Sequence, residues 1–365
     1  MRIELLDVLC CPQSKAACEL VELETAIIDG VQDIVSGILL AKGQPHIYPI
    51  LFGVPIMLPK CVPQNFIDRF AEALVAKQII IPPNQIEQDH STFSFSDEWS
   101  SFYELGLQRT WGHTVEERVE VLLLELALPR SIFPGKILLD AGCGNGQLTE
   151  AISDLGCLTV GMDYAESIYR AESRRTSQSV HYVRGDVSMP PFRNESFDIV
   201  YCSGVLHHTR STAESFKALS NTVKTGGTYH AWVYRWTTLF MPMLYNVITE
   251  ILRTFISRAS TKTRRTVTKY FTLIIHKLLN IYGDYQKRTI EELYISVYDT
   301  LTPTYAHRHT PLEMASWFFE CGFSAPTLTH WDNYNGFGMT AVKRLLPDTP
   351  GVNFRSKNVK DRCVR

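Results

Sequence analysis

Three aspartates, each at the end of a strand-like run, are the side chains best placed to bind a polar small molecule. They are Asp140, Asp163 and Asp186. Asp163 lies 17 residues after Gly146, a position from which a carboxylate can accept hydrogen bonds from ribose hydroxyls. Asp186 could accept from an exocyclic amine while Val187 packs on a purine face. The alternative is that the three acids only cap the ends of strands.

A glycine-rich turn follows the first of these acids. After Asp140 the chain passes through Gly142, Gly144 and Gly146. Glycines allow backbone amides to approach a ligand closely, because no Cβ stands in the way. The third residue after Gly144 is Gln147, so the pattern is G-x-G-x-G and not the G-x-G-x-x-G of dinucleotide sites. The spacing therefore disfavours a pyrophosphate clamp.

The elements that must position these residues alternate in type. Strand-like and helix-like patterns follow one another from Ile137 to Tyr234, which predicts a parallel sheet with helices on both faces. Two later runs, Thr327–Trp331 and Gly338–Arg344, indicate a hairpin that closes the sheet. The fold class predicted from these patterns is α/β.

At this point the sequence resembles the class I S-adenosylmethionine-dependent methyltransferases of the type 11, ubiquinone-biosynthesis-like group. The resemblance covers about residues 110 to 235. Its motifs are Leu139–Gly146, Gly161–Asp163, Gly185–Val187, Ser196–His208 and Val223–Gly227. It implies a seven-stranded, doubly wound, Rossmann-like sheet whose last strand is antiparallel, with S-adenosylmethionine bound over the carboxyl ends of the first strands.

The resemblance also implies the residues of the site. Those expected to bind the cofactor are Asp140, Gly142, Cys143, Gly144, Asn145, Gly146, Asp163, Tyr164, Asp186, Val187, Cys202 and Ser203. His207 and His208 follow where the family places substrate and sulfonium, so either could be a general base. The alternative is that this histidine pair only shapes its loop.

Residues 1–60 read as a small β-rich module. Ile3–Pro12 and Ile47–Leu58 resemble the zinc-ribbon-derived domain of tRNA-methyltransferase activator subunits. A structural zinc site needs four ligands, but only Cys11 remains, and Ser14, Ala41 and Gln44 stand at the other positions. We therefore predict no metal and a packing or docking role. The remaining cysteines of this part, Cys10, Cys18 and Cys61, are expected to be buried thiols.

Residues 61–110 are predicted to form a helical linker and a lid. In similar methyltransferases an aromatic segment before the cofactor domain lies over the cofactor, and Phe95, Trp99 and Trp111 are the candidates here. Aromatic residues at this spacing also occur in the cores of helices. The domain itself is predicted to comprise 111–236 and 296–346, followed by a polar tail over 347–365.

A basic helical insert is predicted over residues 237–295. Between 251 and 290 there are nine Lys and Arg residues and one acid, Asp284. Apolar residues such as Phe271, Leu273, Ile274 and Ile275 lie among these bases. Such a helix could lie in the headgroup zone of a membrane, or it could pack on its own protein with its bases in solvent.

A polar run before the last helix supplies the candidates for a substrate pocket. These are Tyr298, Tyr305, His307 and His309. The histidines lack metal-ligand spacing with a third ligand, so no metal is predicted.

Composition excludes several classes of protein. Lys plus Arg number 36 and Asp plus Glu 38, so the formal charge of −2 argues against a protein that coats nucleic acid as a whole. The nine cysteines have no secreted-scaffold spacing, and the start of the chain has no signal-peptide pattern. No run of about 18 uncharged apolar residues occurs. We therefore expect a cytoplasmic protein, which could contact the inner membrane face through 251–290.

The predicted function is methyl transfer to an oxygen or nitrogen of a small molecule, a sugar or a lipid-linked glycan. The glycan part rests on an overall resemblance to bacterial methyltransferases of glycan and cell-envelope biosynthesis, which is association rather than physics. One alternative is an RNA methyltransferase, although Cys202–Val205 replaces the N-P-P-Y type motif of amino-group nucleic-acid methylases, so we expect no nucleic-acid partner. Another is a non-catalytic cofactor-binding subunit that activates a partner. The acceptor atom and the oligomeric state are left open.

Overall fold

The structure is a computed structural model. It describes residues 1–28, 30–60, 62–86, 98–99, 109, 112–236, 240–282, 289–331 and 336–345. The lid candidates Phe95 and Trp111, the thiols of Cys61 and Cys363, and the predicted tail 347–365 lie outside these residues.

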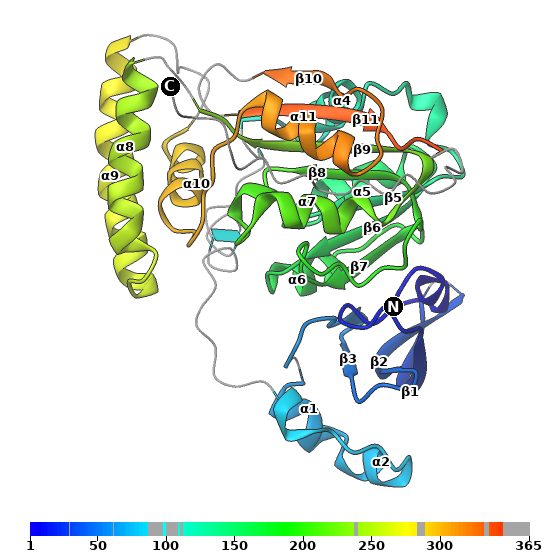
Figure 1. Cartoon of the computed structure of the whole chain (residues 1–365). Coiled ribbons are helices and arrows are strands. Elements are labelled where there is room, and N and C mark those ends of the chain that lie inside the picture. The colour runs from blue at the N-terminus through cyan, green and yellow to red at the C-terminus, as the bar shows by residue number, and fades with distance from the viewer. Residues whose placement is uncertain are drawn as a thin grey trace, which may run out of the picture.

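A seven-stranded sheet forms the centre of the molecule (Figure 1). Its strands are β5 (Ile137–Ala141), β6 (Leu158–Asp163), β7 (Val180–Arg184), β8 (Phe197–Ser203), β9 (Val223–Tyr234), β10 (Thr327–Trp331) and β11 (Gly336–Val342). Their order is β10-β11-β9-β8-β5-β6-β7. Neighbouring strands from β7 to β9 are parallel, and β11 is antiparallel to both β9 and β10. The doubly wound methyltransferase fold with an antiparallel last strand is thereby confirmed.

Helices cover both faces of this sheet because alternate residues of each buried strand point to opposite sides. On one face α4 (Val115–Leu126) and α5 (Gln147–Ser153) pack against Leu138 and Ile199. On the other face α7 (Thr212–Ser220) and α11 (Pro311–Glu320) pack against Val200 and Tyr229. The short helix α6 (Ser167–Ser173) follows β6. The carboxyl ends of the central strands stay open.

The amino-terminal module is a four-stranded antiparallel sheet. Its strands are β1 (Cys18–Ile28), β2 (Val31–Ala41), β3 (Ile47–Leu51) and β4 (Val54–Pro55), in that order. The short helices α1 (Gln64–Arg69) and α2 (Ala71–Ala76) follow, and their Phe66, Phe70 and Leu74 pack on Ile38.

This module closes the edge of the large sheet. Ile56 bridges to Arg184 at the end of β7, and the amide of Met57 donates to the carbonyl of Arg184 at 2.8 Å. Lys15 Nζ donates to the carbonyl of Pro190 at 2.7 Å. An open sheet edge favours unwanted strand pairing, so the module protects β7 as well as packing on it.

The predicted insert consists of α8 (Phe240–Ile256), α9 (Thr261–Tyr282) and α10 (Ile290–Leu301). It is not one continuous helix, because α8 and α9 are separated by a turn at 257–260. The predicted boundary at 295 falls inside α10, whose start is fixed by a capping box between Thr289 and Glu292. Tyr298 and Asp299 are therefore helical and do not belong to a loop. No helix among the described segments is both long and apolar enough to span a bilayer.

Candidate functional site

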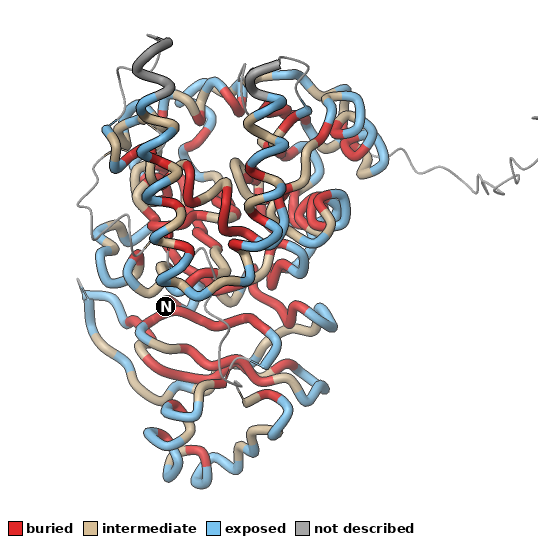
Figure 2. Tube along the Cα trace, turned by 90° about the vertical axis from the view of Figure 1, so that its left-hand side faces the viewer, coloured by how far each residue is buried: buried red, intermediate tan, exposed pale blue. Residues whose placement is uncertain are grey.

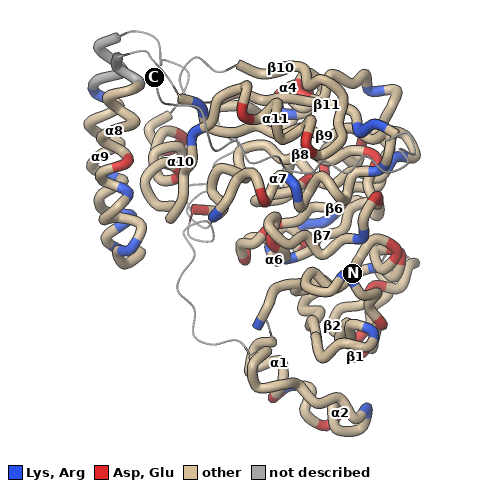
Figure 3. Tube along the Cα trace, in the orientation of Figure 1, with Lys and Arg blue, Asp and Glu red and all other residues tan. Residues whose placement is uncertain are grey.

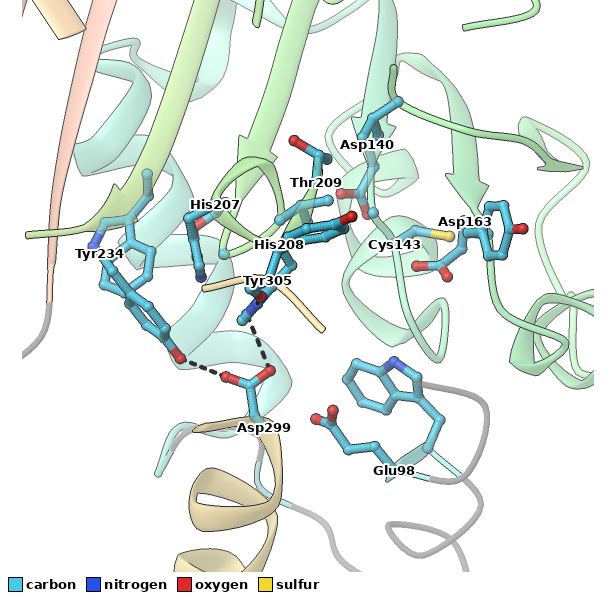
Figure 4. A pocket seen from close by; sticks show the side chains of 18 of the residues that line it. Glu98, Asp140, Cys143, Asp163, His207, His208, Thr209, Tyr234, Asp299 and Tyr305 are labelled. Atoms are coloured by element: carbon cyan, nitrogen blue, oxygen red, sulfur yellow. Dashed lines mark hydrogen bonds and ion pairs between the residues drawn. The ribbon is translucent and has the colours of Figure 1, made fainter. Parts of the chain in front are cut away.

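One cavity of about 760 Å³ opens at the carboxyl ends of β5, β6, β7 and β8 (Figure 4). Its volume lies within the range of roughly 300–1,000 Å³ that is usual for small-molecule sites. Nearly all the residues predicted to bind a cofactor line it. The exceptions are Gly144, Gly146 and Cys202.

The carboxylate of Asp163 is held by backbone amides. Its Oδ2 accepts from the amide of Gly144 and its Oδ1 from the amide of Ala165, both at 2.8 Å. Burial raises the pKa of Asp163, and these hydrogen bonds oppose the rise. Each oxygen retains a lone pair for a further donor. A ribose with two hydroxyls matches that arrangement.

Asp140 and Asp186 lie at the ends of β5 and β7, the strands on either side of β6. Asp140 is buried and accepts from the hydroxyl of Thr149 at 2.7 Å, and burial raises its pKa to about 6. Asp186 Oδ1 accepts from the amide of Ser188 at 2.7 Å. The cavity is thus acidic beside the glycine loop, which suits a ligand that carries an ammonium group and hydroxyl donors.

Two glycines of the loop are required by close packing. A Cβ on Gly142 would lie 2.1 Å from Val205 Cγ2, and one on Gly144 would lie 2.3 Å from the ring of Trp99. Both glycines have positive φ, of 89° and 58°. Trp99 lines the cavity and packs over the loop, which is the position that a lid residue would take. Gly146 lies beneath Tyr182 and is a packing position.

The residues present fit S-adenosylmethionine. Gly204 lines the cavity with φ of 82°, and no atom lies within 4 Å of where its Cβ would be. The space that a side chain would fill is therefore open beside β8. Cys202, by contrast, is completely buried in the core of the sheet, because alternation along β8 points it away from the cavity. The prediction for the Cys202 side chain is wrong, while Ser203 does line the cavity.

The two histidines after β8 have different environments. His207 is completely buried, and its ring lies tilted against that of Tyr234 at a centroid distance of 3.9 Å. Among the described residues, neither of its ring nitrogens has a hydrogen-bond partner. Burial, helped by the neighbouring His208, lowers its pKa well below the usual value. It is therefore a neutral ring that supports the wall of the cavity and is poorly suited to accept a proton.

His208 is held by polar partners. Its Nδ1 lies 2.8 Å from the carbonyl oxygen of Tyr305, which can only accept, so Nδ1 carries a proton. Its Nε2 lies 3.4 Å from Oδ1 of Asp299, and the other oxygen of Asp299 accepts from the hydroxyl of Tyr234 at 2.6 Å (Figure 4). This pattern leaves the lone pair of the neutral ring on Nε2, a buried atom that faces the carboxylate of Asp299.

A second histidine and carboxylate pair lines the same cavity. Glu125 on α4 is buried and accepts from the hydroxyl of Tyr201 at 2.6 Å, and its Oε1 lies 2.7 Å from Nδ1 of His330. Burial opposes ionisation, but His230, His330 and Tyr201 lower the pKa of Glu125 overall. Glu125 is therefore an anion in the cavity wall.

The four residues predicted for the substrate pocket are not equivalent. Tyr305 lines the cavity, and the others do not. Tyr298 is completely buried within α10. His307 lies against the carbonyl of Thr209 at 3.1 Å, and His309 lies between Glu313 and Thr212, each at 2.9 Å. These three hold the chain together behind the wall, so their assignment as pocket residues is wrong.

The insert completes the cavity on the side away from the glycine loop. Ser257 and Arg264 come from the turn between α8 and α9 and from α9, and Ser296, Asp299 and Thr300 come from α10. The site thus combines a nucleotide-type half on the sheet with a polar half built mainly by the insert.

Sequence reasoning missed Asp299, Glu125 and His330. Asp299 lies within the polar run before the last helix, but it was not among the candidates for the substrate pocket. Arg118 and Glu125 lie seven residues apart on α4 and both line the cavity, so two charges on one face of an otherwise amphipathic helix were a usable signal. Nothing local marks His330, because its place on β10 follows only from the closing hairpin.

In the amino-terminal module, Cys11 has polar neighbours but no metal-binding cluster among the described residues. Cys11 Sγ lies 3.1 Å from the hydroxyl of Tyr48 and 3.4 Å from the amide of Ser14. Within the described ranges no cluster of three or more His, Cys, Asp and Glu could hold a metal ion. Cys10 is completely buried, Cys18 is partly buried, and both are free thiols.

Comparisons with known proteins bear on the central part of the chain. Residues 139–231 match the family model described as "Methyltransferase domain". A relative from Hahella chejuensis, "Ubiquinone biosynthesis O-methyltransferase", is 33% identical over 112 residues, which is 30% of this chain and 47% of that protein. A protein of the same name from Coxiella burnetii is 30% identical over 96 residues, which is 26% and 41% of the two chains. The chain thus spans less than half the length of the curated relatives it matches.

Among solved structures the chain is similar to the "Complex between the Haloferax volcanii Trm112 methyltransferase activator and the putative methyltransferase". The identity is 15%, the TM-score is 0.43, and 70% of this chain and 100% of that chain are covered. The family match confirms the methyltransferase resemblance of the central residues, and the resemblance of residues 1–60 to a zinc ribbon stays a prediction.

Proposed function

We propose that this chain, which carries a methyltransferase domain over residues 139–231, transfers a methyl group from S-adenosylmethionine to an oxygen or nitrogen of a small-molecule acceptor. The observation that carries the proposal is one cavity with three strand-end aspartates on one side and the pair His208 and Asp299 on the other. The names of the relatives, which are O-methyltransferases, support oxygen as the acceptor atom.

S-adenosylmethionine, when bound, supplies an electrophilic methyl group on a sulfonium. Asp163 would accept hydrogen bonds from the ribose, Asp186 would accept from the adenine amine, and Asp140 would face the ammonium-bearing part. Val187 offers an apolar surface to the purine. These residues would bind and orient the cofactor. Binding of this kind lowers the activation barrier because it aligns the methyl group with the acceptor.

His208 would take the proton from the acceptor. The carbonyl of Tyr305 fixes the tautomer, so Nε2 has the lone pair. As the methyl carbon leaves the sulfonium sulfur, which becomes the neutral thioether of S-adenosylhomocysteine, and bonds to the acceptor oxygen, the acceptor proton would pass to Nε2 of His208. The positive charge then lies 3.4 Å from Asp299, which Tyr234 holds in place. General-base catalysis of this type contributes about 10²–10⁴-fold to the rate.

More specifically, the acceptor in this proposal is a sugar or a lipid-linked glycan. The polar wall from the insert, including Ser257, Ser296 and Thr300, and the second pair Glu125 and His330 offer several hydrogen-bonding groups. A polyhydroxylated acceptor can use such groups, whereas a flat apolar acceptor would leave them without partners. A cytoplasmic location, with contact between segment 251–290 and the inner membrane face, belongs to the same proposal.

The test is incubation with methyl-labelled S-adenosylmethionine and a lysate, followed by partition of the label among lipid, RNA, protein and small aqueous metabolites. We expect label in the lipid or the aqueous sugar fraction, and loss of that label in the His208→Gln variant. Label confined to RNA would contradict the proposal that the acceptor is a sugar or a lipid-linked glycan. If the cofactor binds tightly and no fraction is labelled, either the lysate lacks the acceptor or the chain acts as a non-catalytic subunit that activates a partner.

A further inference from the structure

The outer side of α8 is apolar although it faces solvent. Leu244, Val247, Ile248, Ile251 and Phe255 stand at positions i, i+3, i+4, i+7 and i+11, which lie on one face of a helix. All five are exposed, with Ile251 at 58% and Phe255 at 75%. Figure 2 looks onto this side of the molecule, where exposed segments run along the two long helices of the insert. We call these five residues the α8 stripe.

Helix α9 adds both apolar and positive side chains to this surface. Tyr270, Leu273 and Ile274 are exposed, whereas Phe271 and Ile275, which the sequence placed on the same apolar face, pack inward with Leu293 and Val297 of α10. The apolar surface therefore differs from the predicted one, and most of it belongs to α8.

The charge of the two helices is strongly positive. Residues 240–282 contain seven Lys and Arg residues and one acid, Glu250. Glu250 is paired with Arg253 and Arg308. Lys and Arg positions recur along α9 and the turn before it (Figure 3). Four of these bases are exposed: Arg258, Lys262, Lys269 and Lys277.

We propose that the α8 stripe and these four bases dock the protein on the surface of an anionic lipid bilayer. Apolar side chains bordered by Lys and Arg are the arrangement that binds the headgroup zone of anionic membranes. A second copy of the chain fits less well, because a two-fold interface would bring the same positive bases of both copies together. A nucleic acid would pair with the bases and leave the stripe in water.

The cavity borders the proposed surface. The turn that carries Arg258 also carries Ser257, and Arg264 lies one turn into α9; Ser257 and Arg264 both line the cavity. Arg264 donates to the carbonyl of Ser257 at 2.6 Å, which ties the cavity wall to the end of the docking helices. An acceptor anchored in the bilayer by its lipid would therefore meet the cavity from this side. This consequence rests on the proposed methyl transfer, whereas bilayer binding itself is argued from the α8 stripe and the four bases alone.

The experiment is flotation of the full chain with vesicles of phosphatidylcholine alone and of phosphatidylcholine mixed with phosphatidylglycerol. We expect binding to the anionic vesicles and weak binding to the neutral ones. Each base near an anionic surface contributes about fivefold to partition, so the double variant Lys262→Glu and Lys269→Glu should lower it by more than about twentyfold. Phe255→Ser should lower partition to both kinds of vesicle.

Matched controls come from other surfaces. Leu312→Ser removes a residue of α11 that is 82% exposed, and Lys217→Glu reverses an exposed charge on α7. Both should float like the wild type. The proposal is overturned if the wild type does not float, or if the controls and the stripe variants behave alike. Two further results, each combined with a wild type that does not bind vesicles, would also overturn it. One is that Phe255→Ser splits a dimer present in solution, and the other is that the charge variants lose binding to a polynucleotide. Calorimetry with S-adenosylhomocysteine, run on the same samples, tests the proposed function separately.

Discussion

Asp140 is a residue whose burial costs stability and whose charge serves binding. Its pKa of about 6 lies above the unfolded value near 3.9. The folded state therefore binds a proton more tightly, and stability falls as the pH rises through the interval from about 4 to 6. Above that interval the ionised carboxylate remains a cost in the ligand-free protein.

The first prediction concerns Asp140→Asn. At pH 7.5 the ligand-free variant should be more stable than the wild type by on the order of 2 kcal/mol, because the amide can still accept from Thr149 without a buried charge. The difference should vanish at pH 4, where both side chains are neutral. Cofactor affinity should fall at least tenfold at pH 7.5. Urea unfolding and calorimetry measure the two effects, and a variant that is less stable at pH 7.5 contradicts the account.

The second prediction separates the two histidines. His208→Gln should lower kcat by about 10²–10⁴-fold with little change in cofactor affinity, because it removes the proton acceptor alone. Asp299→Asn should lower kcat less, since it removes only the charge beside the protonated ring. His207→Gln should chiefly lower stability, because it disturbs a buried ring. Steady-state kinetics with the labelled cofactor measures the loss of kcat in each variant. The assignment of His208 as the general base fails if His207→Gln causes a larger loss of kcat than His208→Gln.

At the scale of elements, the small sheet is fixed to the domain of the large sheet by buried charges. Asp33 on β2 lies 2.9 Å from Nη2 of Arg175, which follows α6, and Glu172 of α6 lies 3.0 Å from Nε of the same arginine. Side chains of Asp33 and Arg175 are 2% and 8% exposed. A pair buried to this extent is costly to break, because the remaining charge loses its partner.

The third prediction follows from that pair. Asp33→Ala should lower the free energy of unfolding by about 3–5 kcal/mol. The control is Arg69→Ala, which removes an ion pair with Glu24 on the exposed side of the same module and should cost at most about 1 kcal/mol. Urea unfolding of the two variants decides the matter, and equal losses would mean that the buried pair does not fix the module.

At the scale of the whole molecule, the small sheet and the large one share a boundary. Leu9 bridges to Phe192, and the amide of Cys10 donates to the carbonyl of Pro191 at 2.9 Å. Both Leu9 and Phe192 are completely buried. The fourth prediction is therefore that the full chain unfolds in a single transition and that removal of residues 1–60 leaves an aggregating protein. Two separate calorimetric transitions would show instead that the module is independent.

The parts of this molecule that could be predicted from sequence are those encoded locally. Each aspartate of the nucleotide-type half of the cavity lies at the end of its own strand. Asp140, Asp163 and Asp186 could therefore be predicted from the periodicity of apolar residues and from their spacing in the sequence. The pair His208 and Asp299 could not be found in that way, because it joins the loop after β8 to a helix of the insert about ninety residues later. The mistaken pocket residues have the same origin, since whether His309 faces a cavity or Thr212 depends on tertiary packing.

The central claim is that the strand-end aspartates form an S-adenosylmethionine site, and titration calorimetry with S-adenosylhomocysteine tests it most directly. The wild type should bind one equivalent, and Asp163→Ala should weaken binding at least thirtyfold while circular dichroism remains that of the wild type. Asp186→Ala should weaken it less, because it removes one acceptor for the adenine amine. Unchanged affinity in a folded Asp163→Ala variant would contradict the account.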